Sequence, residues 1–183
     1  MFGTLIRRFA FFSRLMTDFS SLPFADQNSL LKGGVLEMCA LRGALVFDPV
    51  NNRWPNTNMS MYKDTPSVKL TDITHLISSR VFQMLMDFIS CIQQMGVDEP
   101  TIMLLVLIVL FTPERAGIIR IKWTEKFRAH YISLLQRYMV WRFGMPRSKL
   151  MTSKLLTKLK DLRKLSDTHN SQIQLGKTPY LYW

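Results

Sequence analysis

The stretch FSSLPFADQNSLLKGGVLEMCALRGALVF, residues 19–47, determines how the rest of the chain is interpreted. From Phe24 to Leu45 the apolar residues recur at the spacing of one helix face, and they are Leu30, Leu31, Val35, Met38 and Leu41. Asp26 lies near the start of this segment, where the positive end of a helix dipole favours an anion. Gly33 and Gly34 lie in the middle and permit a bend. The stretch therefore predicts one long helix after a break at residues 20–23.

The segments on either side of this helix have patterns of their own. Residues 4–17 place their large apolar side chains on one face and predict a helix; these residues are Leu5, Phe9, Phe12 and Met16. After the long helix, Phe47 to Pro55 predicts a small hairpin that turns at Asn51 and Asn52. Residues 56–66 are polar and predict a loop.

The second half of the chain predicts further helices. Thr71 is expected to cap a helix that runs to about Met95 and ends at Gly96. A start signal at residues 98–100 precedes the apolar run 102–111, which is about half as long as a membrane span and predicts a buried helix. After a connector at residues 112–117, helices are expected at 118–142 and 148–173. The fold class is therefore all-α, a layered helical domain with one small β hairpin.

Composition limits the class of protein. The chain has 183 residues, 48% of them hydrophobic, which suits one globular domain with a sizeable core. Two cysteines, Cys39 and Cys91, and three histidines cannot build zinc fingers, so no zinc-held DNA-binding domain is expected. The net charge of +11 is compatible with nucleic acid or an anionic membrane, but its densest cluster, Lys149 to Lys164, is equally explained as a solvated helix face.

No pattern of an enzyme is found. The chain has no glycine-rich phosphate loop, no HExxH and no serine elbow, and His75, His130 and His169 have no neighbouring metal ligand in the sequence. We therefore expect neither catalysis nor a cofactor. One alternative stays open, because residues 1–16 carry three arginines and no acid. A basic helix of this kind is also typical of a membrane-associated or mitochondrially targeted protein.

Three separated motifs carry a resemblance to a known family. Residues 19–47, with the core DQxxLLK at 26–32, resemble the signature of nuclear receptor ligand-binding domains. Trp54 follows Phe47 by seven residues, as in the receptors for vitamin D, pregnanes and constitutive androstanes. LFTPERAGI, residues 110–118, and DLRKLSDTH, residues 161–169, resemble two later segments of the same group. The resemblance implies a three-layer helical sandwich around an apolar ligand cavity.

The resemblance also implies ligand-binding residues. Arg42, Trp54, His169 and Cys39 match positions that line the ligand cavity of the family. Arg42 would supply a hydrogen-bond donor, Trp54 a flat apolar wall, and His169 a group that can either donate or accept. Such a set suits a sterol-like or xenobiotic lipophile. A structural ion-pair role for Arg42, and a purely structural role for the histidine and the thiol, stay open as alternatives.

Two further sets of residues match the family. Glu37 and Arg115 match a buried ion pair, which has both a structural and a dimer-related interpretation. The resemblance places Arg14, Gln27, Leu31 and Lys32 at the coactivator groove, where the two cations would hold the C-terminal end of an LxxLL helix. Solvated surface charges are the alternative for those cations.

The helix expected at 148–173 matches the main dimer helix of the family. Leu155, Leu159 and Leu162 form an apolar stripe with a basic surround. By resemblance the partner of this stripe is a retinoid X receptor-like domain, and a stripe that faces the chain's own core is the alternative.

The chain also departs from the family pattern. We expect residues 1–183 to form a partial ligand-binding domain, incomplete at both termini, without a DNA-binding domain and without direct nucleic acid binding. Residues 178–183, TPYLYW, resemble the start of the activation helix only faintly and lack its glutamate. The expected protein is a nuclear one, also compatible with the cytoplasm, that binds LxxLL coregulators weakly, does not activate transcription and has no membrane partner.

Overall fold

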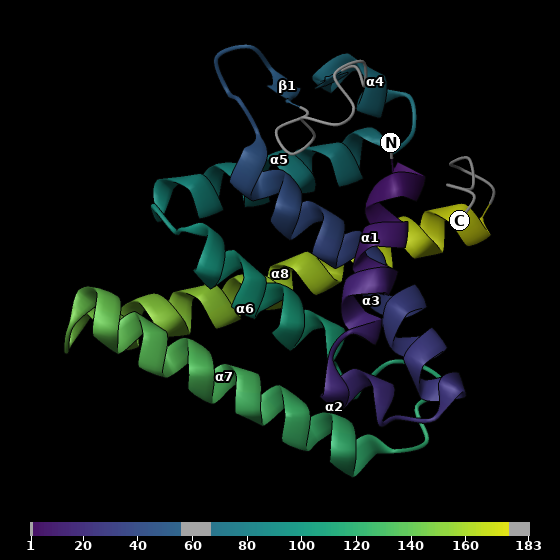
Figure 1. The fold of residues 1–183 in the computed structure, drawn as a ribbon. Coiled ribbons are helices and arrows are strands. Elements are labelled where there is room, and N and C mark those ends of the chain that lie inside the picture. The colour runs from purple at the N-terminus through teal and green to yellow at the C-terminus, as the bar shows by residue number, and fades with distance from the viewer. Residues whose placement is uncertain (1, 56–66, 176–183) are drawn as a thin grey trace.

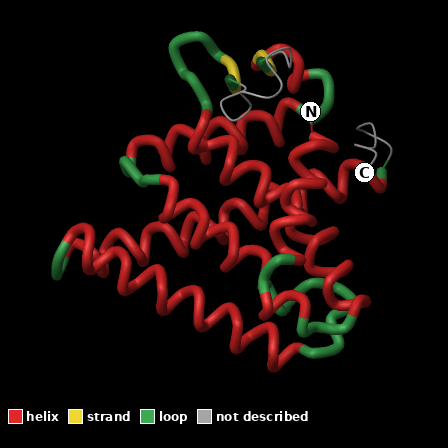
Figure 2. The backbone as a smooth tube through the Cα atoms, in the orientation of Figure 1, coloured by secondary structure: helices red, strands yellow, loops and turns green. Residues whose placement is uncertain are grey.

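A computed structural model describes residues 2–55 and 67–175, and the side chains from Leu5 onward. The described part is mainly helical (Figure 2). Its elements in chain order are α1 (Phe2–Arg14), α2 (Thr17–Ser20), α3 (Phe24–Val46), β1 (Arg53–Trp54), β2 (Val68–Lys69), α4 (Leu70–Thr74), α5 (Ser79–Gln94), α6 (Glu99–Leu110), α7 (Ile121–Phe143) and α8 (Arg147–Gln174). The all-α prediction with one small sheet is confirmed.

The helix α3 is the central element of the fold. It packs against α1, α5, α6 and α8, so it is covered on several sides (Figure 1). This explains why Leu30, Met38 and Leu41 are all 0% exposed. The helix is continuous through Gly33 and Gly34, where the sequence permitted a bend. The lack of a side chain at Gly33 lets the Arg115 side chain approach closely. Burial on several faces, rather than along one stripe, makes α3 a middle-layer helix.

The helix α6 is the second central element. It is apolar on every side, packs against α3 and α7, and contains Ile102, Leu105 and Ile108 at 0% exposure. Its start follows the expected signal, because the side chain of Asp98 accepts a hydrogen bond from the backbone N–H of Thr101, and Pro100 stands in the first turn. The prediction of a buried helix here is confirmed. No helix within the two described ranges has both the length and the apolar character to cross a bilayer.

The strand pairing differs from the predicted hairpin. Asp48 and Arg53 form only an isolated bridge across the turn, in which Asn52 has a φ of 48°. The strand partner of β1 is β2, with Trp54 opposite Val68 in an antiparallel register. The local turn was foreseeable from the two asparagines, but the second strand comes from beyond residues 56–66, which lie outside the described residues.

The helix expected from Thr71 to Met95 is two helices. The short α4 is capped at Lys69, two residues before the predicted cap Thr71, which lies inside the helix, and Asp72 accepts a hydrogen bond from the backbone N–H of Lys69. A break at residues 75–78 follows, and Ser78 then caps α5 through the backbone N–H of Val81. The Ser78 cap was the missed signal, because a serine before an apolar repeat marks a helix start.

The helices α7 and α8 form a long antiparallel hairpin. Gly144, with a φ of 67°, ends α7, and α8 begins three residues later. Figure 1 shows α7 at the edge of the molecule and α8 running past α6 toward α1. In this arrangement α5 and α8 pack against each other and against α3. With α1 on α3 as well, the helices form a layered sandwich.

Candidate functional site

Three of the residues predicted to bind ligand lie around the C-terminal half of α3. Cys39 and Arg42 are on the helix itself, and Trp54 donates a hydrogen bond from Nε1 to the carbonyl oxygen of Gly43 at 3.1 Å. The Trp54 ring also packs on Phe47, with 4.7 Å between the ring centroids. The indole is therefore fixed in position as a wall, with its polar edge already satisfied.

Arg42 is engaged with another helix. Its Nη1 lies 2.9 Å from Oε1 of Glu99 at the start of α6, and the two side chains are 19% and 63% exposed. The ion-pair interpretation of Arg42 that the sequence left open is the one formed in this structure. A ligand acceptor would have to share or replace the contact with Glu99.

Cys39 is buried, and burial raises the pKa of its thiol to about 12. The thiol is therefore protonated at neutral pH and unreactive as a nucleophile. Such a side chain offers a small apolar surface to its neighbours.

His169 stands apart from these three residues because it belongs to α8. Its side chain is 1% exposed, and neither ring nitrogen has a hydrogen-bond partner among the residues that the structure describes. The same is true of Oε1 of Gln172, one helical turn further on. Burial lowers the pKa of His169, which favours the neutral imidazole. A neutral ring carries one donor and one acceptor, and leaving both unpaired in the interior is costly.

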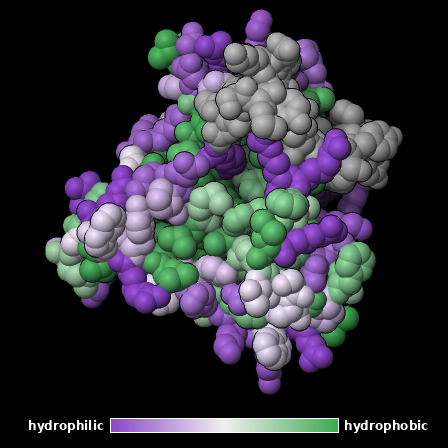
Figure 3. All heavy atoms as spheres, viewed as in Figure 1, coloured by the Kyte–Doolittle hydropathy of each residue, from purple (hydrophilic) through white to green (hydrophobic). Residues whose placement is uncertain are grey.

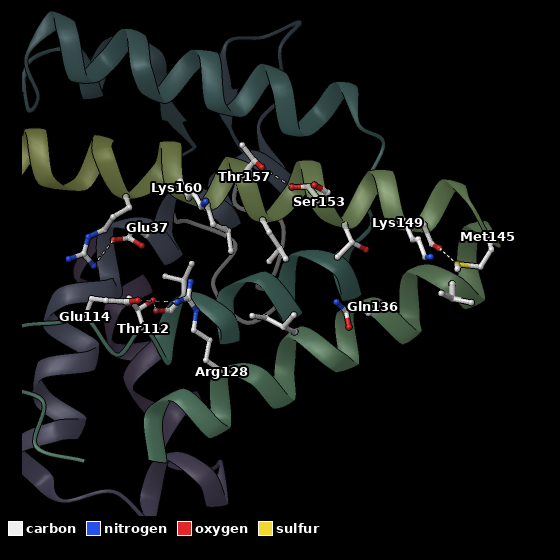
Figure 4. A pocket seen from close by; sticks show the side chains of 18 residues that line it. Glu37, Thr112, Glu114, Arg128, Gln136, Met145, Lys149, Ser153, Thr157 and Lys160 are labelled. Atoms are coloured by element: carbon white, nitrogen blue, oxygen red, sulfur yellow. Dashed lines mark hydrogen bonds and ion pairs between the residues drawn. The ribbon is translucent and has the colours of Figure 1, made fainter. Parts of the chain in front are cut away.

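Two cavities of the described part lie elsewhere. One of about 1120 Å³ lies between α7 and α8, and Figure 4 shows its lining side chains. A second, of about 230 Å³, lies between the end of α3 and α5 and is lined by residues such as Ala44 and Ile92. Neither is lined by Arg42, Trp54, His169 or Cys39. The second is below the usual volume of a pocket for a drug-sized ligand.

Glu37 and Arg115 are joined as the sequence suggested. Arg115 donates from Nη1 and Nη2 to the two carboxylate oxygens of Glu37 at 2.7 and 2.9 Å, and both side chains are 3% exposed. Arg163 of α8 stands 3.8 Å from the same carboxylate. The pair ties α3 to the connector before α7, and its bidentate geometry is the strongest form of such a contact. Because the ion pair is buried, removal of either partner would leave the other as an uncompensated buried charge and would destabilise the fold.

The four residues assigned to the coactivator groove lie on α1 and α3. Arg14, at the end of α1, and Lys32, on α3, are both exposed, whereas Leu31 is half-buried. Gln27 donates a hydrogen bond to the carbonyl oxygen of Leu22 at 2.8 Å and so holds the connection between α2 and α3. Sequence reasoning missed three exposed apolar side chains: Phe11 on α1, Leu15 just after α1, and Phe24 at the start of α3. Figure 3 shows another apolar gathering, near the centre of the face where α6 and α8 cross.

Asp26 has a role that the sequence did not indicate. It is 0% exposed and accepts hydrogen bonds from the backbone N–H groups of Ile119 and Arg120, both at 2.8 Å. It therefore anchors the residues just before α7, instead of serving only the dipole of its own helix. An acid within an otherwise apolar repeat could have indicated a buried role for Asp26. Its partners could not be found from the sequence, because Ile119 and Arg120 are 93 and 94 residues away.

The leucine stripe of α8 faces the interior. Leu155, Leu159 and Leu162 are 0%, 7% and 0% exposed and belong to the core of this chain. The core alternative is therefore the one formed, and these side chains are not presented to a partner. The basic residues between them stay partly or fully exposed, among them Lys154, Lys160 and Lys164.

The first segment belongs to the fold. Phe9 and Ser13 of α1 are buried, and Ser13 donates a hydrogen bond to the carbonyl oxygen of Phe9 at 2.7 Å. Since α1 packs on α3, residues 5–14 form part of the domain. The interpretation of the segment 1–16 as an address helix finds no support in this packing.

Comparison with known proteins gives one family. The family described as the ligand-binding domain of nuclear hormone receptor matches residues 3–178. Nuclear receptor subfamily 1 group I member 2 of Macaca mulatta is 24% identical over 162 residues, which are 88% of this chain and 36% of the relative. The vitamin D3 receptor of Gallus gallus is 28% identical over 163 residues, 88% of this chain and 35% of the relative. Nuclear receptor subfamily 1 group I member 3 of Callorhinus ursinus is 26% identical over 164 residues, 89% of this chain and 45% of the relative.

These relatives are the group that the sequence motifs indicated, so that resemblance is confirmed. The chain spans between about a third and a half of the length of these relatives.

Proposed function

Because the chain belongs to the family of nuclear hormone receptor ligand-binding domains, we propose that it binds a lipophilic ligand and regulates transcription through it. Members of this family are receptors and not enzymes, which agrees with the lack of a catalytic motif in the sequence. The proposal has three parts. The chain is regulated by a ligand, the ligand is a sterol-like or xenobiotic molecule, and the chain acts in the nucleus.

The observation that carries the ligand proposal is His169. A buried imidazole whose two nitrogens have no partner among the described residues is destabilising unless another group satisfies it. A ligand hydroxyl or carbonyl of a largely apolar molecule would supply the missing hydrogen bond. Trp54 and Cys39 would add apolar contact, and Arg42 a second polar contact in exchange for Glu99.

The proposed partners follow from the same family. A retinoid X receptor-like domain would pair with the surface of α8, through its exposed basic residues rather than through the buried leucines. LxxLL coregulators would bind weakly between Arg14 and Lys32. Residues 178–183, which faintly resemble the start of the activation helix, lie outside the described residues.

Thermal unfolding with a panel of sterols and apolar xenobiotics tests the proposal. A ligand should raise the melting temperature of the wild type, and should do so much less for His169→Phe, which keeps the ring and removes both nitrogens. Without ligand, His169→Phe should be more stable than the wild type by about 1 kcal/mol, because no unpaired polar group is buried. His130→Phe, on the exposed face of α7, should respond to the ligand as the wild type does. The proposal fails if no compound shifts the wild type, or if both variants respond equally.

A further inference from the structure

The turn that joins α7 to α8 carries exposed apolar side chains. Trp141 is 79% exposed, Met145 57% and Leu150 58%, and we call these three residues the hairpin tip. Trp141 lies two residues before the end of α7, and Leu150 three residues after the start of α8. At about 1.5 Å per helical residue, both lie within roughly 5 Å of the helix ends. Figure 1 shows this turn as the outermost part of the molecule on the left of the view.

The tip is built on a fixed turn. The guanidinium groups of Arg142 and Arg147 lie over the ring of Phe143, at 4.8 and 5.0 Å from its centroid. Arg142 also donates a hydrogen bond to the carbonyl oxygen of Gly96 at 3.1 Å, which holds the end of α7 against the segment before α6. The apolar side chains are therefore presented to solvent by an ordered structure.

Basic side chains lie one helical turn behind the tip. Arg137 precedes Trp141 by four residues and Lys154 follows Leu150 by four, so each cation shares a helix face with an apolar side chain. We call Arg137 and Lys154 the basic collar. Both are exposed, and neither forms a salt bridge within the described part of the chain. Residues 126–160 contain nine Lys or Arg residues and no Asp or Glu, so no acid of this hairpin weakens the positive field.

We propose that the hairpin tip inserts into the surface of an anionic lipid bilayer, with the basic collar at the level of the lipid phosphates. Peripheral elements bury their apolar side chains about 5–10 Å into the interface, which matches the depth of the tip. Tryptophan favours this depth, and each cation near an anionic surface adds attraction. From the sequence we expected no membrane partner, but a peripheral contact needs no spanning helix. The proposal is independent of ligand binding.

Other partners fit the tip less well. Trp141 and Leu150 belong to different helices, and neither lines the cavity between α7 and α8. A protein surface would meet one side of a projecting turn, whereas lipid surrounds it. A nucleic acid backbone would meet the cations but offers no apolar medium for Met145 and Leu150. An anionic bilayer satisfies the apolar end and the cations behind it together.

Cosedimentation of the full chain with lipid vesicles tests the proposal. Vesicles of phosphatidylcholine with about 30% phosphatidylserine should bind the chain saturably, and added salt should weaken the binding. Vesicles of phosphatidylcholine alone should bind at least tenfold more weakly, because each of the two collar cations contributes about fivefold on an anionic surface. Absence of binding to the anionic vesicles, or equal binding to both kinds, would overturn the proposal.

Substitution of apolar residues locates the contact. Trp141→Ser with Leu150→Ser should weaken binding to the anionic vesicles by about tenfold or more, because lost apolar burial is not replaced. Trp123→Ser with Ile119→Ser makes a similar change at exposed positions of 51% and 69% near the other end of α7, and should leave binding nearly unchanged. Circular dichroism should show that both double variants keep their helices. Equal losses in the two would mean that the tip is not the contact.

The collar has its own matched pair. Arg137→Gln with Lys154→Gln should weaken binding to the anionic vesicles by about tenfold or more. Lys122→Gln with Lys164→Gln removes the same charge from exposed positions away from the tip, and should weaken it much less. An equal loss in both would show attraction by net charge alone, against the proposal.

A milder variant tests insertion without loss of binding. Brominated phospholipids should quench the tryptophan fluorescence of the wild type, because bromine on the acyl chains reaches only an inserted indole. Trp141→Phe keeps an apolar side chain and should bind with little change, but its quenching should be largely lost. Trp123→Phe should be quenched as the wild type is. Undiminished quenching in Trp141→Phe would contradict insertion of the tip. The proposal would also fail if a DNA duplex displaced the chain from the vesicles and its own binding depended on Trp141 and Leu150.

Discussion

Gly33 shows how a single position couples two distant segments. A Cβ built at Gly33 would stand 2.6 Å from Cδ of Arg115, closer than side chains tolerate. The arginine passes over this glycine on its way to Glu37, on the same helix. The absence of a side chain at residue 33 therefore allows the buried ion pair to form.

Gly33→Ala should lower the free energy of unfolding by about 1–3 kcal/mol, because the added methyl group displaces the Arg115 side chain. Gly34→Ala is the matched control, since its nearest described neighbour would be at an ordinary 3.5 Å. On the same helix, alanine at residue 34 should be neutral or stabilising by up to about 1 kcal/mol. Urea unfolding of the three proteins measures both effects. Two variants of equal stability would show that Arg115 can move aside at no cost.

At the scale of elements, Asp98 joins two helices. It caps α6 through the backbone N–H of Thr101, accepts a hydrogen bond from the hydroxyl of Tyr138, and lies 2.7 Å from Nη1 of Arg142. Tyr138 and Arg142 belong to the end of α7, so one carboxylate holds the start of α6 against the end of α7. Partial burial raises the pKa of Asp98, but the hydrogen bonds from Thr101 and Tyr138 and the charge of Arg142 outweigh it, so the pKa lies below its ordinary value of 3.8.

The lowered pKa of Asp98 predicts a pH dependence of stability. A carboxyl group whose pKa is lower in the folded state stabilises the fold above its unfolded pKa, and this contribution is lost as the pH falls through the folded pKa. Asp98→Asn should therefore be less stable than the wild type at pH 7, and the difference should shrink below a pH of about 4. Asp98→Ala, which also removes the cap, should lose about 1–2 kcal/mol. Thermal unfolding between pH 3 and 7 measures this, with Asp87→Asn on α5 as an exposed control that should stay near the wild type.

At the scale of the whole molecule, α8 holds the sandwich together. It packs against α3, α5 and α7, and Leu155, Leu159 and Leu162 belong to the hydrophobic core. A stripe of leucines on a basic helix is compatible with a dimer surface as well as with a core. In this chain the leucines are buried in the core, and the cations between them remain toward solvent.

Leu162→Ala should lower the free energy of unfolding of the single chain by about 2–5 kcal/mol, because Leu162 is 0% exposed and its truncation leaves a cavity. Leu150→Ala, on the same helix at 58% exposure, should change it by no more than about 0.5 kcal/mol. Guanidinium unfolding at two protein concentrations measures the stability and whether it depends on association. If Leu162→Ala instead lowered only the affinity between copies or for a partner, the leucine would be an interface residue.

The sequence by itself determined the helical class, most helix bounds and the family. Helical periodicity and caps are local signals, and the signals at residues 98–100 and at Gly96 were correct within a residue or two. Arg115 and Glu37 could be paired only through the resemblance, because 78 residues separate them. Two errors of the prediction were also local. The cap at Ser78 was overlooked, and β1 was expected to pair within the hairpin 47–55 instead of with β2.

Tertiary structure alone decided what each side chain faces. Periodicity gives the face of a helix but not what covers it, so it could not place the leucines of α8 in the core or Arg42 against Glu99. It could not show that Asp26 anchors the segment before α7, or that His169 is buried without a partner in the described residues. The cavity between α7 and α8 depends on the separation of two helices, which no local pattern encodes. These features arise from contacts between residues far apart in the chain, and they exist only once the helices are packed.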